Sequence, residues 1–181
     1  KQLLGQTGEE AEATADRALQ MSKAFGWDVN ESLRAVSATQ SAWGATSEES
    51  FDMFAALTQQ AGDKADDLLD TFNEYSPTLA EVGWSMEDVG NAMARGMQNG
   101  AYNYDVMADA LKEFKVLTTD GNDNTKEWAA TLLGGKAQAD KFFAGLADGS
   151  LSGSDAVGMI TEKIGGMDDK NLQMQAGVAM F

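Results

Sequence analysis

One stretch of the chain sets the pattern for the rest: residues 44–62 read GATSEESFDMFAALTQQAG. Gly44 can close a preceding helix, because glycine adopts the left-handed conformation found after helix C-termini at little steric cost. Thr46 and Glu49 stand three residues apart, the spacing of a capping box, in which each side chain accepts a hydrogen bond from the other residue's backbone N–H. Apolar residues then recur at helical spacing: Phe51, Phe54, Ala55 and Leu57. The stretch predicts one short amphipathic helix between Gly44 and Gly62.

The same order of glycine, cap and apolar run recurs along the first two thirds of the chain. Glycines stand at positions 26, 44, 62, 83, 100 and 121, at intervals of 18, 18, 21, 17 and 21 residues. The further candidate N-caps are Asp28 with Glu31, Asp63 and Asp66, Ser85 with Asp88, and Asn103. Each interval holds one helix and one turn, and a helix of that length cannot bury its apolar face alone. We therefore predict an all-α array of short antiparallel helices, of the helix-turn-helix repeat type, arranged as a solenoid or a compact bundle.

The pattern also predicts one buried helix face and one interruption. A helix over residues 9–25 should end at Gly26 and share one face among Ala11, Ala15, Ala18, Leu19, Ser22 and Phe25. In the fourth interval, Pro77 removes a backbone donor and disfavours a helical conformation at Ser76. We expect a kink there, or a short second helix over about residues 78–82.

A polar stretch divides the chain into two predicted subdomains. After Leu117 the residues from Thr118 to Asn124 form the longest loop signal in the sequence. We therefore place a boundary between a helical repeat subdomain, residues 1–118, and a second, more glycine-broken helical subdomain, residues 119–181. Four helices are expected in the latter: Thr125–Leu133, Lys136–Ala147, Ser154–Ile164 and Asp168–Phe181. Shorter helices with more glycine predict that this subdomain is the less rigid of the two.

The amino-acid composition disfavours several classes of function. Thirteen basic and 29 acidic residues give a net charge of −16, which opposes approach to a phosphate backbone and predicts no direct nucleic acid binding. Histidine and cysteine are absent from the sequence, which removes the commonest general base, the thiolate nucleophile and the usual soft metal ligands. No run of about 20 apolar residues predicts a membrane span. We expect no enzymatic activity, no cofactor, no metal and no membrane contact. A start at Lys1, without methionine, and an end directly after an apolar run suggest an internal segment of a longer chain.

Four groups of residues partly resemble functional sites, and a structural role is favoured for each. Asp120, Asn122 and Asn124 begin like a calcium loop, but Thr125 and Thr131 stand where that loop needs glycine and glutamate, so a turn of capping residues is favoured. Acidic neighbours such as Glu48 with Glu49, or Asp66 with Asp67 and Asp70, fit exposed surface or caps. Core packing is favoured for the aromatic residues Trp27, Trp43, Phe51, Phe54, Phe72, Trp84 and Phe114, and for the methionines Met86, Met93, Met97 and Met107, although the latter set would also suit an adaptable groove.

Three stretches of the chain resemble the tail tape measure proteins of phages, which belong to the phage-related minor tail proteins. They read DLLDTFNEYSP at residues 67–77, NGAYNYD at residues 99–105 and AGVAMF at residues 176–181. The resemblance extends from about Ala24 to the end and lies in the order of these stretches, not in a catalytic signature. It implies a structural segment of a long protein that runs through the tail tube, sets tail length, serves tail assembly and leaves ahead of the DNA during genome delivery.

The resemblance also implies partners and a location. The partners would be tail tube and tail-tip proteins, tail assembly chaperones and, in the tail, further copies of the same chain. The location would be the tube lumen of the virion tail, after synthesis in the host cytoplasm. One feature departs from a continuous coiled-coil rod, because sustained heptads are missing and glycine recurs every 17 to 21 residues. We expect small helical units of modest stability, which would unravel readily to pass a narrow tube.

Two other functions stay open at the level of sequence. One is a helical-repeat scaffold for protein–protein interaction, which predicts an exposed methionine-rich groove. The other is a fragment of a carboxylate hydrolase, which predicts two inward-facing carboxyl groups in one pocket with separated pKa values.

Overall fold

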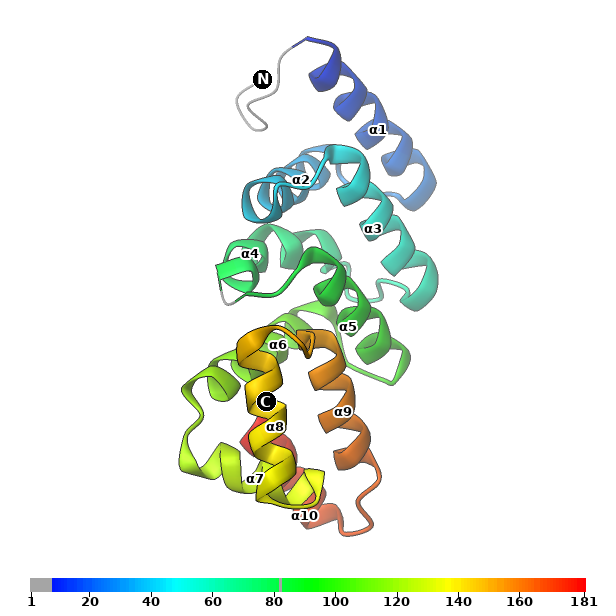
Figure 1. The fold of residues 1–181 in the computed structure, drawn as a ribbon. Coiled ribbons are helices and arrows are strands. Elements are labelled where there is room, and N and C mark those ends of the chain that lie inside the picture. Colours follow the sequence, from blue (N-terminus) through cyan, green and yellow to red (C-terminus); the bar gives the residue numbers. More distant parts are fainter. Residues whose placement is uncertain (1–7, 82) are drawn as a thin grey trace. The chain divides into compact units, whose positions relative to one another are not determined.

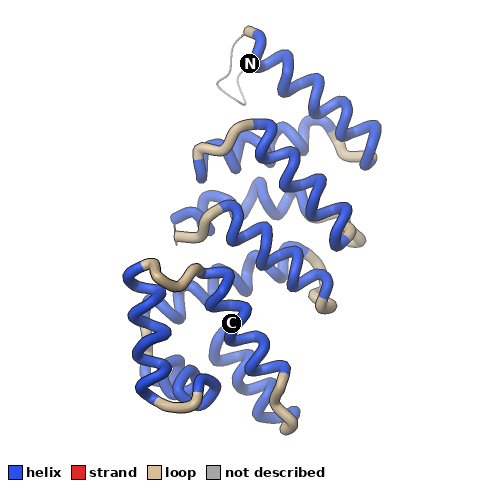
Figure 2. Tube along the Cα trace, turned by 45° about the vertical axis from the view of Figure 1, so that its right-hand side comes forward, coloured by secondary structure: helices blue, strands red, loops and turns tan. Residues whose placement is uncertain are grey.

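The fold was obtained as a computed structural model, which describes residues 8–81 and 83–181. In these residues the chain forms ten α-helices and no strands, which confirms the predicted all-α class (Figure 1). The helices are α1 (Glu9–Phe25), α2 (Val29–Trp43), α3 (Ser47–Ala61), α4 (Leu68–Glu81), α5 (Met86–Gln98), α6 (Tyr104–Asp120), α7 (Asp123–Leu133), α8 (Lys136–Asp148), α9 (Gly153–Gly165) and α10 (Lys170–Met180). Short turns join them (Figure 2).

Two compact units make up the chain, residues 1–108 and residues 109–181, and they meet inside α6. The predicted boundary between residues 118 and 119, as a border of separate subdomains, stays a prediction. The long loop expected there is wrong, because α6 continues to Asp120 and α7 begins at Asp123. Thr118 explains the difference: its side chain is buried, and its hydroxyl donates to the carbonyls of Phe114 and Lys115 within α6. A polar residue that bonds back to its own helix does not end that helix.

Within the first unit, helices pack in two layers. Helix α3 packs against α1 and α5, and α2 packs along α4, so alternate helices share a layer (Figure 1). Consecutive helices α1 and α2, and α2 and α3, also contact each other across their turns. This is the array of antiparallel helices that the glycine spacing predicts.

The predicted helix ends are confirmed at single residues. Gly26 and Gly44 adopt the left-handed conformation, with φ angles of 81° and 70°, after α1 and α2. Asp28 accepts hydrogen bonds from the backbone N–H groups of Asn30 and Glu31 at the start of α2. Thr46 and Glu49 form the complete capping box at the start of α3. These bonds satisfy N–H groups that a helix leaves without partners in its first turn.

Aromatic rings fill the core of the first unit, as predicted. Phe51, Phe54 and Phe72 are at most 1% exposed, and the rings of Phe54 and Phe72 lie 5.0 Å apart. Trp27 and Trp84, each next to a turn glycine, are also buried. Large rings therefore pack beneath the turns that join the helices.

The predicted buried face of α1 is wrong in part. Ala18 is buried, but the face turns toward Thr14 and Met21, and Leu19 is 49% exposed. The reason is that α1 contacts α2 and α3 along one stripe, and Leu19 lies outside it. Apolar spacing alone does not show which side of a wide apolar stripe meets the neighbouring helices.

Pro77 does not divide the fourth helix. Helix α4 runs without a break from Leu68 to Glu81, and the Ser76 hydroxyl donates to the carbonyl of Phe72. The separate short helix expected over residues 78–82 is therefore wrong for residues 78–81, and Val82 lies outside the described residues. The packing of α4 along α2, which buries Phe72, Ser76 and Leu79, maintains the helix although proline supplies no backbone donor.

In the second unit, α7 contacts α8, α9 and α10. The core contains Phe114, Phe142, Ile160 and Met180, each at most 4% exposed, and the rings of Phe114 and Phe181 stack at 5.3 Å. All four helices predicted after residue 119 are present, with ends shifted by one or two residues. The lower rigidity expected for these residues stays a prediction.

Candidate functional site: the joints between helices

Polar side chains of the first unit bond helices that are distant in the sequence. These bonds join residues 33 to 47 positions apart, a separation of two helices or more. We call the three places where they gather joints. We call two consecutive helices with their turn a hairpin: α1–α2, α3–α4 and α5–α6. Each joint supplies hydrogen bonds between one hairpin and the next.

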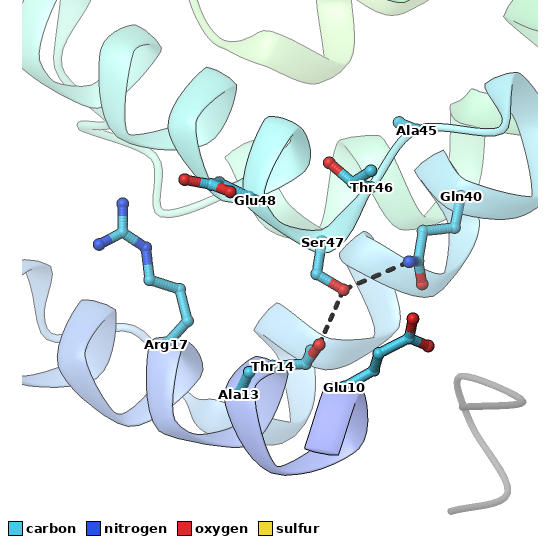
Figure 3. A pocket seen from close by; sticks show the side chains of 9 residues that line it. All are labelled: Glu10, Ala13, Thr14, Arg17, Gln40, Ala45, Thr46, Ser47 and Glu48. Atoms are coloured by element: carbon cyan, nitrogen blue, oxygen red, sulfur yellow. Dashed lines mark hydrogen bonds between the residues drawn. The ribbon is translucent and has the colours of Figure 1, made fainter. Parts of the chain in front are cut away.

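The first joint ties α1 to α2 and α3. The Thr14 hydroxyl donates to Oγ of Ser47 at 2.9 Å, and the Gln40 amide donates to the same oxygen at 3.2 Å (Figure 3). Arg17 and Asp52 form an ion pair at 2.8 Å, with side chains 40% and 59% exposed. A pair so exposed to water contributes less than about 1 kcal/mol. The first joint is therefore the more weakly held side of the array.

A cleft of about 560 Å³ lies beside the first joint. Figure 3 shows that its lining comes from α1, from the end of α2 and from the start of α3. Charged groups of both signs, Glu10, Glu48 and Arg17, stand around it together with the hydroxyls of Thr14 and Ser47. These polar groups stand beside the apolar side chains of Ala13 and Ala45, so the cleft is lined by both kinds of surface.

The second joint ties the end of α2 to the turn between α4 and α5. The Trp43 indole N–H donates to the carbonyl oxygen of Trp84 at 2.7 Å. Both tryptophans stand next to turn glycines, Gly44 and Gly83. The sequence predicted ring packing near these turns, and the structure adds the hydrogen bond.

The third joint connects α3, α4 and α6 through Asp67 and Tyr104. The Asp67 carboxylate accepts hydrogen bonds from the backbone N–H of Tyr104 at 3.4 Å and of Asp105 at 3.0 Å, at the start of α6. The Tyr104 hydroxyl donates to the carbonyls of Gly62, at 2.8 Å, and Leu57, at 3.2 Å, at the end of α3. Tyr104 is fully buried. The Asp67 side chain thus satisfies N–H groups at the start of α6 that the helix itself leaves without partners, and the Tyr104 side chain bonds the C-terminal end of α3.

Asp63 completes the third joint at the start of α4. Its carboxylate accepts from the backbone N–H of Asp67 at 3.1 Å and of Leu68 at 3.3 Å. Burial raises the pKa of Asp63, the two backbone hydrogen bonds oppose this, and nearby Asp67 and Asp66 add to the rise. Burial, with the charges of Asp63 and Asp67, also raises the pKa of Tyr104. Tyr104 therefore stays a neutral hydrogen-bond donor at any physiological pH.

Several residues that the sequence offered as candidate sites form helix caps or hydrogen bonds between helices. Asn122 accepts a hydrogen bond from the Thr125 N–H at 2.9 Å and caps α7, as expected of a capping turn. Within the described residues, no group of three or more Asp or Glu side chains is placed to hold a metal ion. Glu49 belongs to the capping box of α3, and Asp67 to the third joint.

The predicted methionine set does not gather in one exposed groove. Met93 is fully buried, and Met107 packs against Gly96. Met86 lines a smaller cleft of about 250 Å³ between α3 and α5, together with Met53 and Leu57. Core packing, the favoured reading, therefore holds for Met93.

Sequence reasoning missed the central residues of the third joint. Asp63 was predicted as a cap, but Asp67 was treated as one of many acidic neighbours, and Tyr104 was given no role. Their partners lie 37 to 47 residues away, beyond the reach of any local pattern. The one signal was that both residues fall in the stretches that carry the family resemblance, residues 67–77 and 99–105.

Comparisons with known proteins agree with a structural segment. A profile of the family described as phage-related minor tail protein matches residues 1–181. The chain is also 34% identical over 173 residues to the uncharacterized protein YqbO of Bacillus subtilis (strain 168). That match covers 94% of this chain and 11% of the relative, so the chain spans about a tenth of the length of the curated relative it matches. No solved structure matches.

One further finding concerns the length and the apolar character of the helices. Across residues 8–81 and 83–181, none is both long and apolar enough to cross a membrane. The family profile matches the whole length of the chain, and this match identifies the family. This chain belongs to the phage-related minor tail protein family.

Proposed function

We propose that the chain is an internal segment of a tail tape measure protein, with a role in tail length determination, tail assembly and genome delivery. The observation that carries the proposal is the match of the family profile to the whole chain. The small share of the relative's length that the chain covers, 11%, supports it, because a long parent chain is what a tape measure requires. The net charge of −16 suits a protein that travels ahead of DNA without binding it.

The array explains how such a segment would work without catalysis. Its helices are 11 to 17 residues long, and side-chain bonds at the joints hold them side by side. Each helix is at most about 26 Å long, whereas the whole chain would span roughly 270 Å as one continuous helix and about 600 Å when fully extended. The segment therefore contributes most to length when it is drawn out inside the tube lumen. Tail tube proteins, tail-tip proteins and assembly chaperones are its proposed partners, and its role is non-enzymatic.

An in-frame deletion tests the proposal. Residues 9–108, from the start of α1 to the end of the first unit, would be removed from the full parent chain, and tail lengths measured by electron microscopy. We expect tails shorter by roughly 150 Å if the segment is a continuous helix in the tail, or by about 330 Å if it is extended. A matched control removes residues 109–181, which should shorten tails in proportion to its smaller length. Tails of unchanged length in both deletions would overturn the proposal.

A helical-repeat scaffold is the alternative. The cleft between α3 and α5 favours it, because Met53, Met86 and Leu57 offer an adaptable apolar lining. Met53→Glu would block that cleft from the α3 side. Loss of tail assembly with normal folding and with no change in the length of any tails that form would favour the scaffold over the tape measure.

A further inference from the structure

The joints of the first unit differ in burial. At the first joint, Arg17 and Asp52 are partly exposed, and an open cleft lies beside them. At the third joint, Tyr104 is fully buried, and its hydroxyl donates to the carbonyl of Leu57 in α3 and to that of Gly62 directly after α3. Water can replace the ion pair of the first joint as it breaks, but it cannot reach the Tyr104 hydroxyl of the third joint until the helices separate.

The third joint also makes two hairpins depend on each other. Without Tyr104, the carbonyl of Gly62 beyond α3 loses its hydrogen-bond donor, and without Asp67 the first N–H groups of α6 lose their acceptor. Opening either hairpin alone therefore leaves polar groups of the other without partners in a buried place. The packing of α5 on α3 adds an apolar contact between the same two hairpins.

We propose that Asp67 and Tyr104 form a lock that joins the α3–α4 hairpin to α5 and the first turn of α6 in a single opening unit, while α1 opens independently and first. The array then does not unravel one hairpin at a time along its whole length. It yields from the α1 side and resists at the third joint. The lock is a property of the fold and does not rest on the tape measure proposal.

Hydrogen exchange of the full 181-residue chain, followed by mass spectrometry, tests the lock. In the unaltered chain, amides of α3, α4 and α5 should exchange through one shared opening with a common dependence on urea, and amides of α1 should exchange sooner. Tyr104→Phe keeps the ring and removes the hydroxyl. We expect it to lower protection in α5 and the first turn of α6 by about tenfold or more, relative to α2 and α4.

Two matched variants control for the change itself. Tyr102→Phe removes a hydroxyl two residues earlier from a side chain that is 83% exposed, and should leave protection unchanged. Asp67→Asn is a second test variant, because it weakens the acceptor for the N–H groups of α6. Its control is Asp66→Asn, which removes one negative charge from the same turn at an exposed position. Asp67→Asn also serves as the milder variant if Tyr104→Phe fails to fold, which circular dichroism would show.

Either of two results would overturn the proposal. The first is that α3–α4 and α5 of the unaltered chain open independently, with different dependences on urea. The second is that Tyr104→Phe and Asp67→Asn change protection no more than Tyr102→Phe and Asp66→Asn do. Neither result bears on tail length, so the lock and the proposed function fail separately.

Discussion

Single side chains decide how neighbouring helices of the first unit are bonded. Asp63 caps the helix that begins a few residues later, whereas Asp67 caps a helix that begins at Tyr104. The two carboxylates stand four residues apart and do the same chemical work, but one acts locally and the other across the fold. A substitution at a single residue should therefore change the free energy of unfolding in a direction that the local contacts predict.

The titration of Asp63 gives a pH-dependent contribution with a definite sign. Burial raises its pKa, so the folded chain binds this proton more tightly than the unfolded chain does. Asp63 therefore adds stability as the pH falls through its folded-state pKa and loses that contribution as the pH rises. Asp63→Asn removes the titration but keeps an oxygen for the cap. From about pH 7 to about pH 4, the free energy of unfolding should shift in favour of the original chain relative to D63N in urea titrations. A difference that stays constant would contradict this.

Two helical glycines predict different results for the same substitution. A Cβ added at Gly177 in α10 meets no atom within 4 Å, whereas one added at Gly145 in α8 lies 3.1 Å from Cβ of Leu151. Alanine is favoured over glycine inside helices by about 1 kcal/mol. Gly177→Ala should raise the free energy of unfolding by about 0.5–1 kcal/mol, and Gly145→Ala should raise it less or lower it. Urea unfolding measures both, and equal gains would show that Leu151 moves without cost.

At the scale of elements, the caps determine where helices begin, and packing determines how far they continue. Helix α3 begins at the capping box of Thr46 and Glu49, which the sequence shows directly. Helix α4 continues through Pro77, and α6 continues through Thr118, because burial against neighbouring residues outweighs the local signal to stop. Start signals are local hydrogen bonds, so they are more easily recognised than stop signals that packing can override.

Helix α4 supplies the prediction that belongs to this scale. Pro77 has no backbone N–H, so the Asn73 carbonyl one turn earlier lacks a backbone donor. The side chain of Pro77 is exposed. Pro77→Ala restores that donor and should raise the free energy of unfolding by about 1–3 kcal/mol in urea titrations. Thr78→Ala, the next residue along, is the control for a substitution that restores no hydrogen bond. A loss of stability in P77A would mean that α2 packs against a shape of α4 that only proline maintains.

At the scale of the whole molecule, charge is unevenly shared between the two units. Residues 1–108 carry 18 of the 29 acidic residues but only 6 of the 13 basic ones. A compact unit with such an excess of one sign is destabilised by its own repulsion, and salt screens that repulsion beyond about 10 Å at 0.1 M. This repulsion lowers the free energy needed to open the first unit, which suits a segment that is proposed to be drawn out inside the tube lumen.

Salt dependence tests this view of the whole chain. The Tm should rise as NaCl increases from about 10 mM to about 150 mM, because screened repulsion outweighs the weakening of exposed ion pairs such as Arg17 with Asp52. Circular dichroism at increasing temperature measures it, and choline chloride should act as NaCl does if screening is the cause. A Tm that falls with salt would show that ion pairs contribute more than repulsion.

The sequence by itself determined the class of the fold, the starts of most helices and the positions of the turns. Asp28, Thr46, Ser85 and Asn122 each bond to N–H groups within three residues, so their role is written in the local order of residues. Tertiary structure alone decided which face of α1 is buried, that α4 passes through Pro77, and that Asp67 and Tyr104 meet. Those outcomes depend on residues of other helices, 37 positions away in the case of Asp67 and Tyr104, and the free energy of burying a side chain against such a neighbour exceeds the local preference that a sequence displays.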